Sequence, residues 1–120
     1  MNLIVTGSRD WTDCKLLFAT LDNLTSKLDR KRLMVHVGDA RGVDSLVRQW
    51  CFERRIAMKV FHADWDTHRK AAGFIRNREM IEAAGPKAVC VAFHKNNSPG
   101  TADCIRQAKK AGLQIRIVRR

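Results

Sequence analysis

With 120 residues, of which 45% are hydrophobic, the chain is long enough for a buried core, and we expect residues 1–120 to form a single domain. No apolar run approaches the roughly 18 residues of a membrane span, and the N-terminus lacks a basic segment with a cleavage site, so we expect a cytoplasmic protein without membrane contact. The 23 Lys and Arg residues exceed the 12 Asp and Glu residues and give a net charge of +11, which predicts an anionic partner.

Residues 2–6 form an apolar, β-branched run, which predicts the first strand. Leucines at helical spacing from Leu16 to Leu28 predict the first helix, capped by Thr12 or Asp13. Residues 33–37 predict a second strand, and a loop with two glycines separates it from a second helix that begins near Val43. Residues 57–61 predict a short third strand.

Residues 66–73 are polar and basic and interrupt the alternation of strands and helices. A third helix is expected from about residue 73 to 84, where Gly85 and Pro86 end it. Residues 88–93 are continuously apolar, as is typical of a central parallel strand. A fourth helix over residues 101–111 ends at Gly112, and residues 113–118 predict the last strand.

Five strands that alternate with four helices predict an α/β three-layer sandwich with a five-stranded parallel sheet. Right-handed crossovers and helices on both faces require the strand order to reverse. If the first strand is the pivot, the order is 3-2-1-4-5. Ligands then bind at the carboxyl ends of strands one and four, where three polar loops meet.

The first of these loops offers the backbone amides of Gly7 and Ser8, the Ser8 hydroxyl and the guanidinium of Arg9. Glycines let a backbone approach an anion closely, and Arg binds a phosphate through two parallel hydrogen bonds. The first loop therefore predicts a phosphate contact.

The second loop offers Gly38, Arg41, Gly42 and Asp44. Its spacing matches neither the dinucleotide fingerprint nor the Walker loop, so a plain strand-to-helix turn remains open. A carboxylate suits a ribose hydroxyl better than a phosphate. Alternatively, Asp44 is a first-turn residue that the helix dipole favours.

The third loop offers Ser98, Gly100 and Thr101, which could bring amides and a hydroxyl onto a second phosphate at a helix N-terminus. Arg76 and Asn77 are expected to open the third helix. Because the helix dipole opposes a cation at that place, a bound anion would explain Arg76.

The four histidines and four cysteines show no metal-ligand spacing, and no two cysteines form a C-x-x-C pair. We therefore expect core thiols, no metal and no cofactor. The three tryptophans are scattered and tyrosine is absent, so no aromatic stripe for stacking on nucleic acid is evident.

Five short motifs occur in one order along nearly the whole chain: Thr6-Gly7-Ser8-Arg9-Asp10-Trp11; His36-Val37-Gly38-Asp39-Ala40-Arg41-Gly42-Val43-Asp44; Ala63-Asp64-Trp65 with Ala72-Gly73; Arg76-Asn77 with Met80; and Pro99-Gly100-Thr101-Ala102-Asp103. Together they resemble the small stand-alone SLOG-domain proteins of the YspA/YpsA-related type, which are frequent in bacteria and their phages. The resemblance implies a Rossmann-like fold that binds nucleotides or nucleotide-derived ligands such as ADP-ribose or NAD derivatives. It also leaves a homodimer open.

The phosphoribohydrolases of the same superfamily carry an Arg and a Glu as their catalytic pair. Arg76 matches the Arg, but Cys104 stands where the Glu belongs, and a thiol cannot replace that carboxylate. Their activity is therefore not expected here.

Three functions remain. The first is binding or sensing of a nucleotide-derived small molecule. The second is hydrolysis of such a ligand, with Asp44, Asp64 or Asp103 as acid or base. The third is nucleic-acid binding, which the charge and the relationship to the DNA-uptake protein DprA permit.

Overall fold

The computed structural model describes residues 1–120 and contains one sheet of five parallel strands. The strands are β1 (Asn2–Gly7), β2 (Met34–Gly38), β3 (Ala57–Phe61), β4 (Val89–His94) and β5 (Gln114–Arg119). Their order is β3-β2-β1-β4-β5, with β1 at the centre, which confirms the predicted order and the three-layer α/β class.

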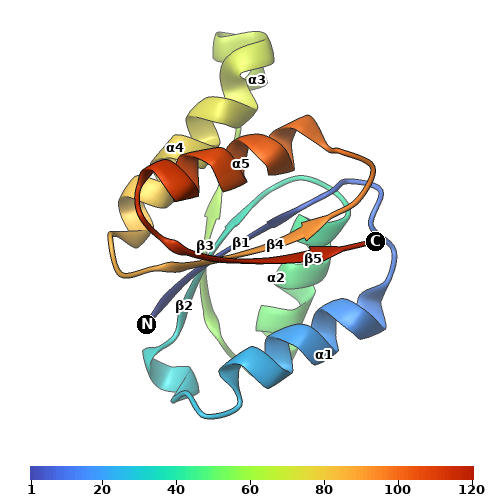
Figure 1. The fold of residues 1–120 in the computed structure, drawn as a ribbon, viewed down its shortest axis with the longest axis vertical. Coiled ribbons are helices and arrows are strands. Elements are labelled where there is room, and N and C mark those ends of the chain that lie inside the picture. The colour runs from blue at the N-terminus through green and yellow to red at the C-terminus, as the bar shows by residue number, and fades with distance from the viewer.

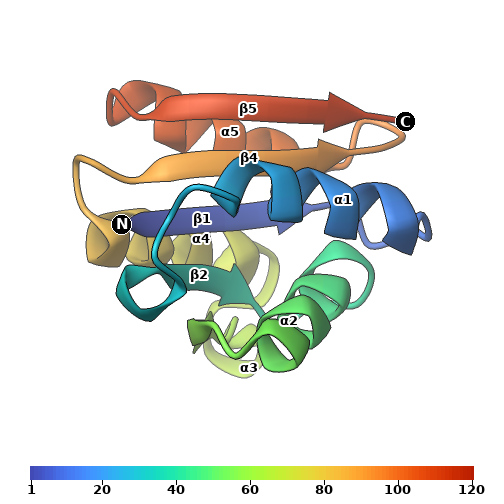
Figure 2. The ribbon, with the colours of Figure 1, turned by 90° about the horizontal axis from the view of Figure 1, so that it is seen from below.

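Helices cover both faces of the sheet (Figures 1 and 2). The helices α1 (Cys14–Thr25) and α2 (Val43–Arg54) lie on one face, and α4 (Ala72–Ala84) and α5 (Pro99–Lys110) lie on the other. Two 3-10 turns, η1 (Arg30–Arg32) and η2 (Arg69–Ala71), and the short helix α3 (Trp65–His68) complete the chain. No helix combines the length and the apolar character that crossing a membrane requires.

The central strand supplies side chains to both cores, because successive residues of a strand point to opposite faces. Leu3 and Val5 belong to the core beneath α1 and α2, and Ile4 belongs to the core beneath α4 and α5. Leu17 of α1 is fully buried, and burial of such a side chain stabilises a fold by about 1.5–3 kcal/mol. The apolar pattern of the sequence thus accounts for the layers.

Several element ends differ from the prediction. The first helix ends at Thr25 rather than at Leu28, and a turn follows in which Leu28 N donates a hydrogen bond to Thr25 O at 3.0 Å. Of the two proposed caps of α1, Asp13 is the one that accepts a hydrogen bond from a helical amide, that of Leu16.

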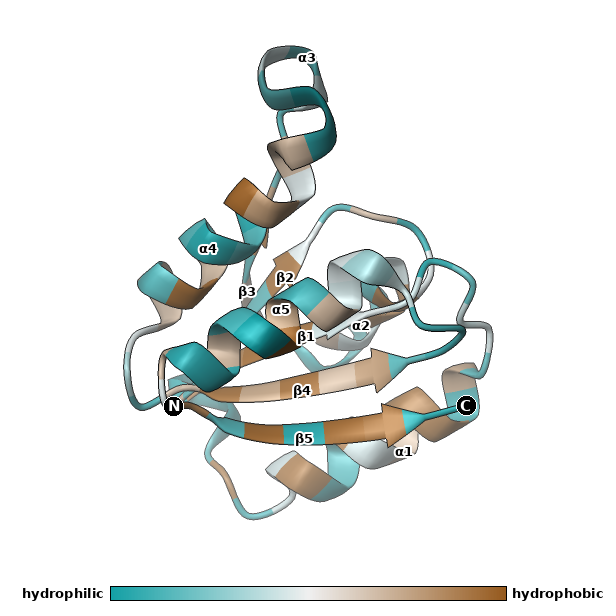
Figure 3. Cartoon of the chain, turned by 45° about the horizontal axis from the view of Figure 1, so that its top comes forward, coloured by the Kyte–Doolittle hydropathy of each residue, from teal (hydrophilic) through white to brown (hydrophobic).

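The polar segment that interrupts the alternation contains α3 and η2, which the prediction missed. Figure 3 shows that this segment is hydrophilic and projects beyond the sheet from the start of α4. Asp64 caps α3 by accepting a hydrogen bond from Thr67 N at 3.1 Å. A four-residue helix is too short to show an apolar periodicity, which is why the pattern did not reveal it.

Candidate functional site

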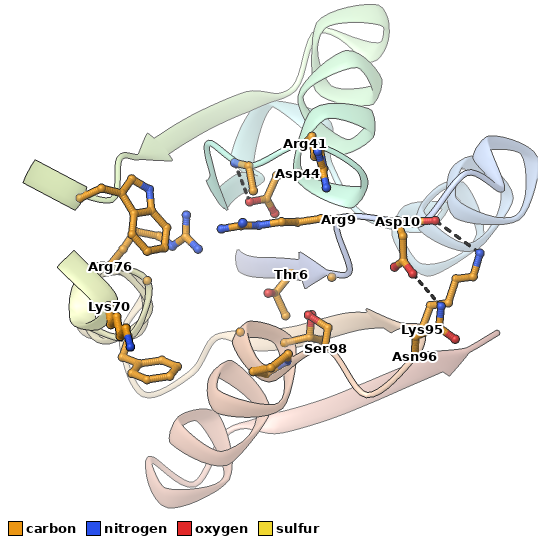
Figure 4. A pocket seen from close by; sticks show the side chains of 18 residues that line it. Thr6, Arg9, Asp10, Arg41, Asp44, Lys70, Arg76, Lys95, Asn96 and Ser98 are labelled. Carbon is orange, nitrogen blue, oxygen red and sulfur yellow. Dashed lines mark hydrogen bonds between the residues drawn. The ribbon is translucent and has the colours of Figure 1, made fainter. Parts of the chain in front are cut away.

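The loops that follow β1, β2 and β4 line one cavity of about 450 Å³ at the carboxyl edge of the sheet (Figure 4). The start of α4 and the segment before it close a further side. This volume lies within the range of about 300–1,000 Å³ that small-molecule pockets occupy. The position, at the point where the strand order reverses, is where open α/β sheets bind ligands.

The structure divides the twelve predicted site residues into two groups. Eight line the cavity: Gly7, Arg9, Arg41, Asp44, Arg76, Ser98, Gly100 and Thr101. The other four lie outside the lining: Ser8, Gly38, Gly42 and Asn77.

Two residues of the second group hold the loops together. The Ser8 hydroxyl is fully buried, accepts a hydrogen bond from Lys95 N at 2.7 Å and donates one to Lys95 O at 2.9 Å. Gly42 has φ +75°, and a Cβ there would lie 2.5 Å from the carbonyl oxygens of Ser8 and Arg9. Only glycine tolerates this close approach without strain, so Gly42 lets the second loop pack on the first.

The carboxyl group of Asp44 lies at the inner wall of the cavity, and the residue is only 5% exposed. Its Oδ2 accepts a hydrogen bond from Ala40 N at 3.1 Å. Burial raises the pKa of Asp44 from 3.8 to about 6, although the charge of Arg76 and the Ala40 hydrogen bond act in the opposite direction. A Cβ at Gly38 would lie 2.5 Å from Asp44 Oδ2, so this glycine leaves room for the carboxyl group.

Arg76 and Asn77 do not open a helix. They lie in the second turn of α4 and are buried. Arg76 Nη1 donates to Asp39 Oδ1 at 3.2 Å, and Asn77 Nδ2 donates to Gly100 O at 3.2 Å. The expectation that Arg76 opens the helix is therefore wrong, because α4 begins at Ala72. Asp39 supplies a negative charge beside Arg76, so the position of Arg76 does not by itself require a bound anion.

The cavity lining carries a positive charge. Five of its residues are basic and two are acidic: Arg9, Arg41, Lys70, Arg76 and Lys95, and Asp10 and Asp44. Arg9 and Arg41 are exposed and form no ion pair within the chain. Figure 4 shows both projecting over the middle of the cavity, on the side opposite Ser98. Unpaired guanidinium groups in a pocket favour an anionic ligand.

The N-terminus of α5 completes this middle region. Ser98 is its N-cap but makes no side-chain hydrogen bond to a helical amide, and its Oγ instead accepts a hydrogen bond from Thr101 Oγ1 at 3.2 Å. The amide N–H groups of Gly100 and Thr101 donate to no group of the protein. Helix amides that lack a protein acceptor are a common anion-binding feature.

Sequence reasoning missed several lining residues, and two of them are aromatic. Trp65 and Phe74 line the wall formed by α3 and α4. The Arg9 guanidinium carbon lies 5.6 Å from the centre of the Trp65 ring. The motif Ala63-Asp64-Trp65 could have pointed to Trp65 as a site residue. The spacing of the tryptophans, however, does not show which of them reaches the cavity.

The residues considered as acid or base differ in their burial and in their position relative to the cavity. Cys104 is fully buried, and hydrogen bonding to Cys90 together with burial raises the pKa of its thiol. Asp103 accepts hydrogen bonds from Asn77 at 3.1 Å and from Arg106 at 2.5 Å and does not line the cavity. Asp64 is exposed and caps α3. Among the proposed acid or base residues, Asp44 is therefore the one that lines the cavity.

A five-stranded parallel sheet with this strand order defines a Rossmann-like α/β domain, with a basic cavity at the carboxyl edge of its sheet. Residues 1–68 match the model of the YspA, cpYpsA-related SLOG family, and the chain belongs to this family. The chain is 35% identical over 118 residues to the Gene 61 protein of Mycobacterium phage D29. The matched region covers 94% of this chain and 92% of that protein. No solved structure matches it significantly.

Proposed function

We propose that the chain binds a nucleotide-derived phosphorylated ligand, such as ADP-ribose, an NAD derivative or a nucleotide, and thereby senses or sequesters it. One observation carries the proposal. The open N-terminus of α5 lines the same cavity as Arg9 and Arg41, which have no carboxylate partner. The family is one in which a nucleotide-related ligand is expected, which supports the same conclusion.

In this proposal the phosphate lies between the two guanidinium groups and the amides of Gly100 and Thr101. The guanidinium groups neutralise it and fix its orientation through paired hydrogen bonds. Asp44 then takes the role of acceptor for a ribose hydroxyl at the inner wall. Such a hydrogen bond would compensate part of the cost of keeping its carboxylate away from water.

A thermal-shift panel tests the proposal with ADP-ribose, cyclic ADP-ribose isomers, NAD, mononucleotides and a short single-stranded DNA. A ligand at about 100 times its Kd stabilises the fold by about 2.7 kcal/mol, which amounts to several degrees for a domain of this size. Arg9→Ala and Arg41→Ala are expected to remove the shift. Arg32→Ala is the matched control, since the Arg32 side chain is 87% exposed and lies in η1, before the amino end of β2.

Unchanged affinity in Arg9→Ala and Arg41→Ala would refute the proposal. A shift with DNA alone would favour the nucleic-acid alternative that the charge of +11 permits. The salt dependence then separates the two, because binding along a phosphate backbone weakens steeply with salt and binding of one nucleotide weakens much less.

One observation favours a second candidate, hydrolysis of an N-glycosidic or phosphoanhydride bond. Asp44 lines the cavity with a pKa raised by burial to about 6, which suits a general acid near neutral pH. The other carboxylate of the lining, Asp10, accepts a hydrogen bond from Asn96 Nδ2 at 2.7 Å. Product formation from NAD, ADP-ribose or a nucleoside monophosphate, lost in Asp44→Asn, would establish this activity.

A further inference from the structure

Two large aromatic side chains are exposed on one wall of the cavity. Trp65 is 47% exposed and Phe74 is 45% exposed. The other exposed large apolar side chains of the chain, Met1, Phe52 and Met58, do not line this cavity. Aromatic rings left in contact with water beside a polar pocket are typical of binding surfaces. The aromatic wall, formed by Trp65 and Phe74, therefore needs an explanation that the phosphate contacts do not give.

The Trp65 ring lies against the start of α4. The residue is the first of α3, directly after the cap Asp64. Its Cη2 lies 3.6 Å from the position that a Cβ would take at Gly73, so the ring lies against the first turn of α4. Its indole N–H has no acceptor in the protein. By contrast, the indole of Trp11 donates to the backbone oxygen of Asp13, and that of Trp50 donates to the Asp22 carboxylate. The indole N–H of Trp65 is thus free to donate to a ligand.

Phe74 is held by a different contact. Its backbone oxygen accepts a hydrogen bond from Gln107 Nε2 at 3.1 Å, which joins the start of α4 to α5. The aromatic wall is therefore formed by α3 and α4, and this hydrogen bond joins it to α5, whose N-terminus lines the same cavity. Figure 4 shows Lys70 and Arg76 on this side of the cavity, and Asp10, Lys95 and Asn96 on the far side, with Thr6 and Ser98 between them.

We propose that the ligand carries an aromatic base and that this base stacks on Trp65. The proposal rests on the proposed function and adds to it the side chain that contacts the base. Every base has a π-face, so an aromatic platform recognises this class without selecting one base. The free indole N–H is an additional donor for a polar atom of the ligand.

Arg9 connects the two ends of the cavity. In this structure its guanidinium lies over the Trp65 ring, 5.6 Å from the ring centre, and has no carboxylate partner. A phosphate at the N-terminus of α5 attracts this guanidinium more strongly than the ring does, since a charge-assisted hydrogen bond exceeds an exposed cation–π contact. Movement of Arg9 toward the phosphate uncovers the ring for the base.

The test compares adenosine 5′-monophosphate with ribose 5-phosphate, which has the same sugar phosphate and no base. Kd values are measured calorimetrically for the wild type, Trp65→Leu, Trp65→Phe and the matched control Phe52→Leu. Phe52 is 82% exposed on α2 and does not line the cavity. Circular dichroism and a urea titration establish that each variant is folded.

Trp65→Leu is expected to raise the Kd for adenosine 5′-monophosphate by about tenfold or more, which is the range expected for the loss of one base–aromatic stack. Ribose 5-phosphate is expected to bind Trp65→Leu and the wild type within about twofold of each other, since the phosphate contacts are retained. Trp65→Phe is expected to retain most of the affinity for adenosine 5′-monophosphate, and Phe52→Leu all of it.

Ligand binding is also expected to change the tryptophan fluorescence of the wild type but not that of Trp65→Phe. Trp11 and Trp50 are at most 2% exposed and therefore do not contact a ligand in the cavity.

Two results would overturn the stacking proposal alone. Trp65→Leu could lose affinity for both probes equally, or it could lose affinity for neither. If the wild type bound ribose 5-phosphate as tightly as adenosine 5′-monophosphate, the base would contribute nothing and the proposal would also fail. Failure of the wild type to bind either probe or any nucleotide of the thermal-shift panel would instead refute the nucleotide pocket itself, and the stacking proposal with it.

Discussion

The buried carboxyl group of Asp44 makes a quantitative prediction about stability. Its pKa is raised from 3.8 to about 6 by burial, in a residue that is 5% exposed. A group whose pKa is raised by folding stabilises the fold at low pH, and that contribution is lost as the pH rises through the folded-state value. Keeping the charged form buried therefore costs the free protein about 3 kcal/mol at pH 7.5.

The variant Asp44→Asn removes this titration and keeps a similar shape. The free energy of unfolding of the variant minus that of the wild type should be larger at pH 7.5 than at pH 5, by about 1 kcal/mol. Burial and the charge of Lys59 lower the pKa of His36, so protonation of His36 destabilises the fold at low pH. Both proteins retain His36, and this effect therefore cancels in the difference. Any change in stability that the asparagine amide itself causes is the same at both pH values, so it does not affect this comparison.

Urea titrations followed by tryptophan fluorescence at the two pH values measure this difference. Trp11 and Trp50 are buried and report unfolding. A difference that is independent of pH would show that the Asp44 carboxylate is solvated in the folded protein. A difference of opposite sign would show that the charge of Arg76 outweighs burial. Either result would refute the reasoning and remove the argument for Asp44 as a general acid.

Four further variants test the packing of the fold. Gly7→Ala should lower the free energy of unfolding by about 1–3 kcal/mol in a urea titration, the usual cost of overpacking, since a Cβ would contact Val43 and lie 2.6 Å from Phe93 O. Gly100→Ala, where a Cβ meets nothing within 4 Å, should be neutral or stabilising, and equal losses in the two would contradict this account. Leu17→Ala should cost about 2–5 kcal/mol in calorimetry; a loss below 1 kcal/mol would contradict its full burial in the core. Asp22→Ala should cost about 1–3 kcal/mol in a urea titration, because it removes the acceptor of the buried Trp50 Nε1, which donates to Asp22 Oδ1 at 2.9 Å, and of the Arg54 guanidinium; double-mutant analysis with Trp50→Phe checks the coupling.

The sequence was sufficient to predict the strands and their order. Residues 88–93 read as a central strand because they are apolar on both faces, and β4 occupies that place beside β1. The physical reason is local: a period of two or a continuous apolar run records how many faces of a strand are buried. The chirality of the crossovers then leaves few arrangements.

The sequence also placed three polar loops at one edge of the sheet, and the structure brings them to one cavity. It did not show which side chains of those loops face the cavity. Ser8 and Asn77 were predicted to contact the ligand, yet Ser8 binds the Lys95 backbone and Asn77 binds Gly100 O and Asp103. These partners lie 23 to 87 residues away along the chain.

The aromatic wall is the clearest feature that only the tertiary structure decided. Trp11, Trp50 and Trp65 are equally plausible as core residues from their spacing alone, but two are buried and Trp65 is 47% exposed beside Arg9. Local patterns fix helices and strands because backbone hydrogen bonding and side-chain periodicity act between near neighbours. The direction of a loop side chain depends on contacts between distant segments, and no local pattern records these contacts.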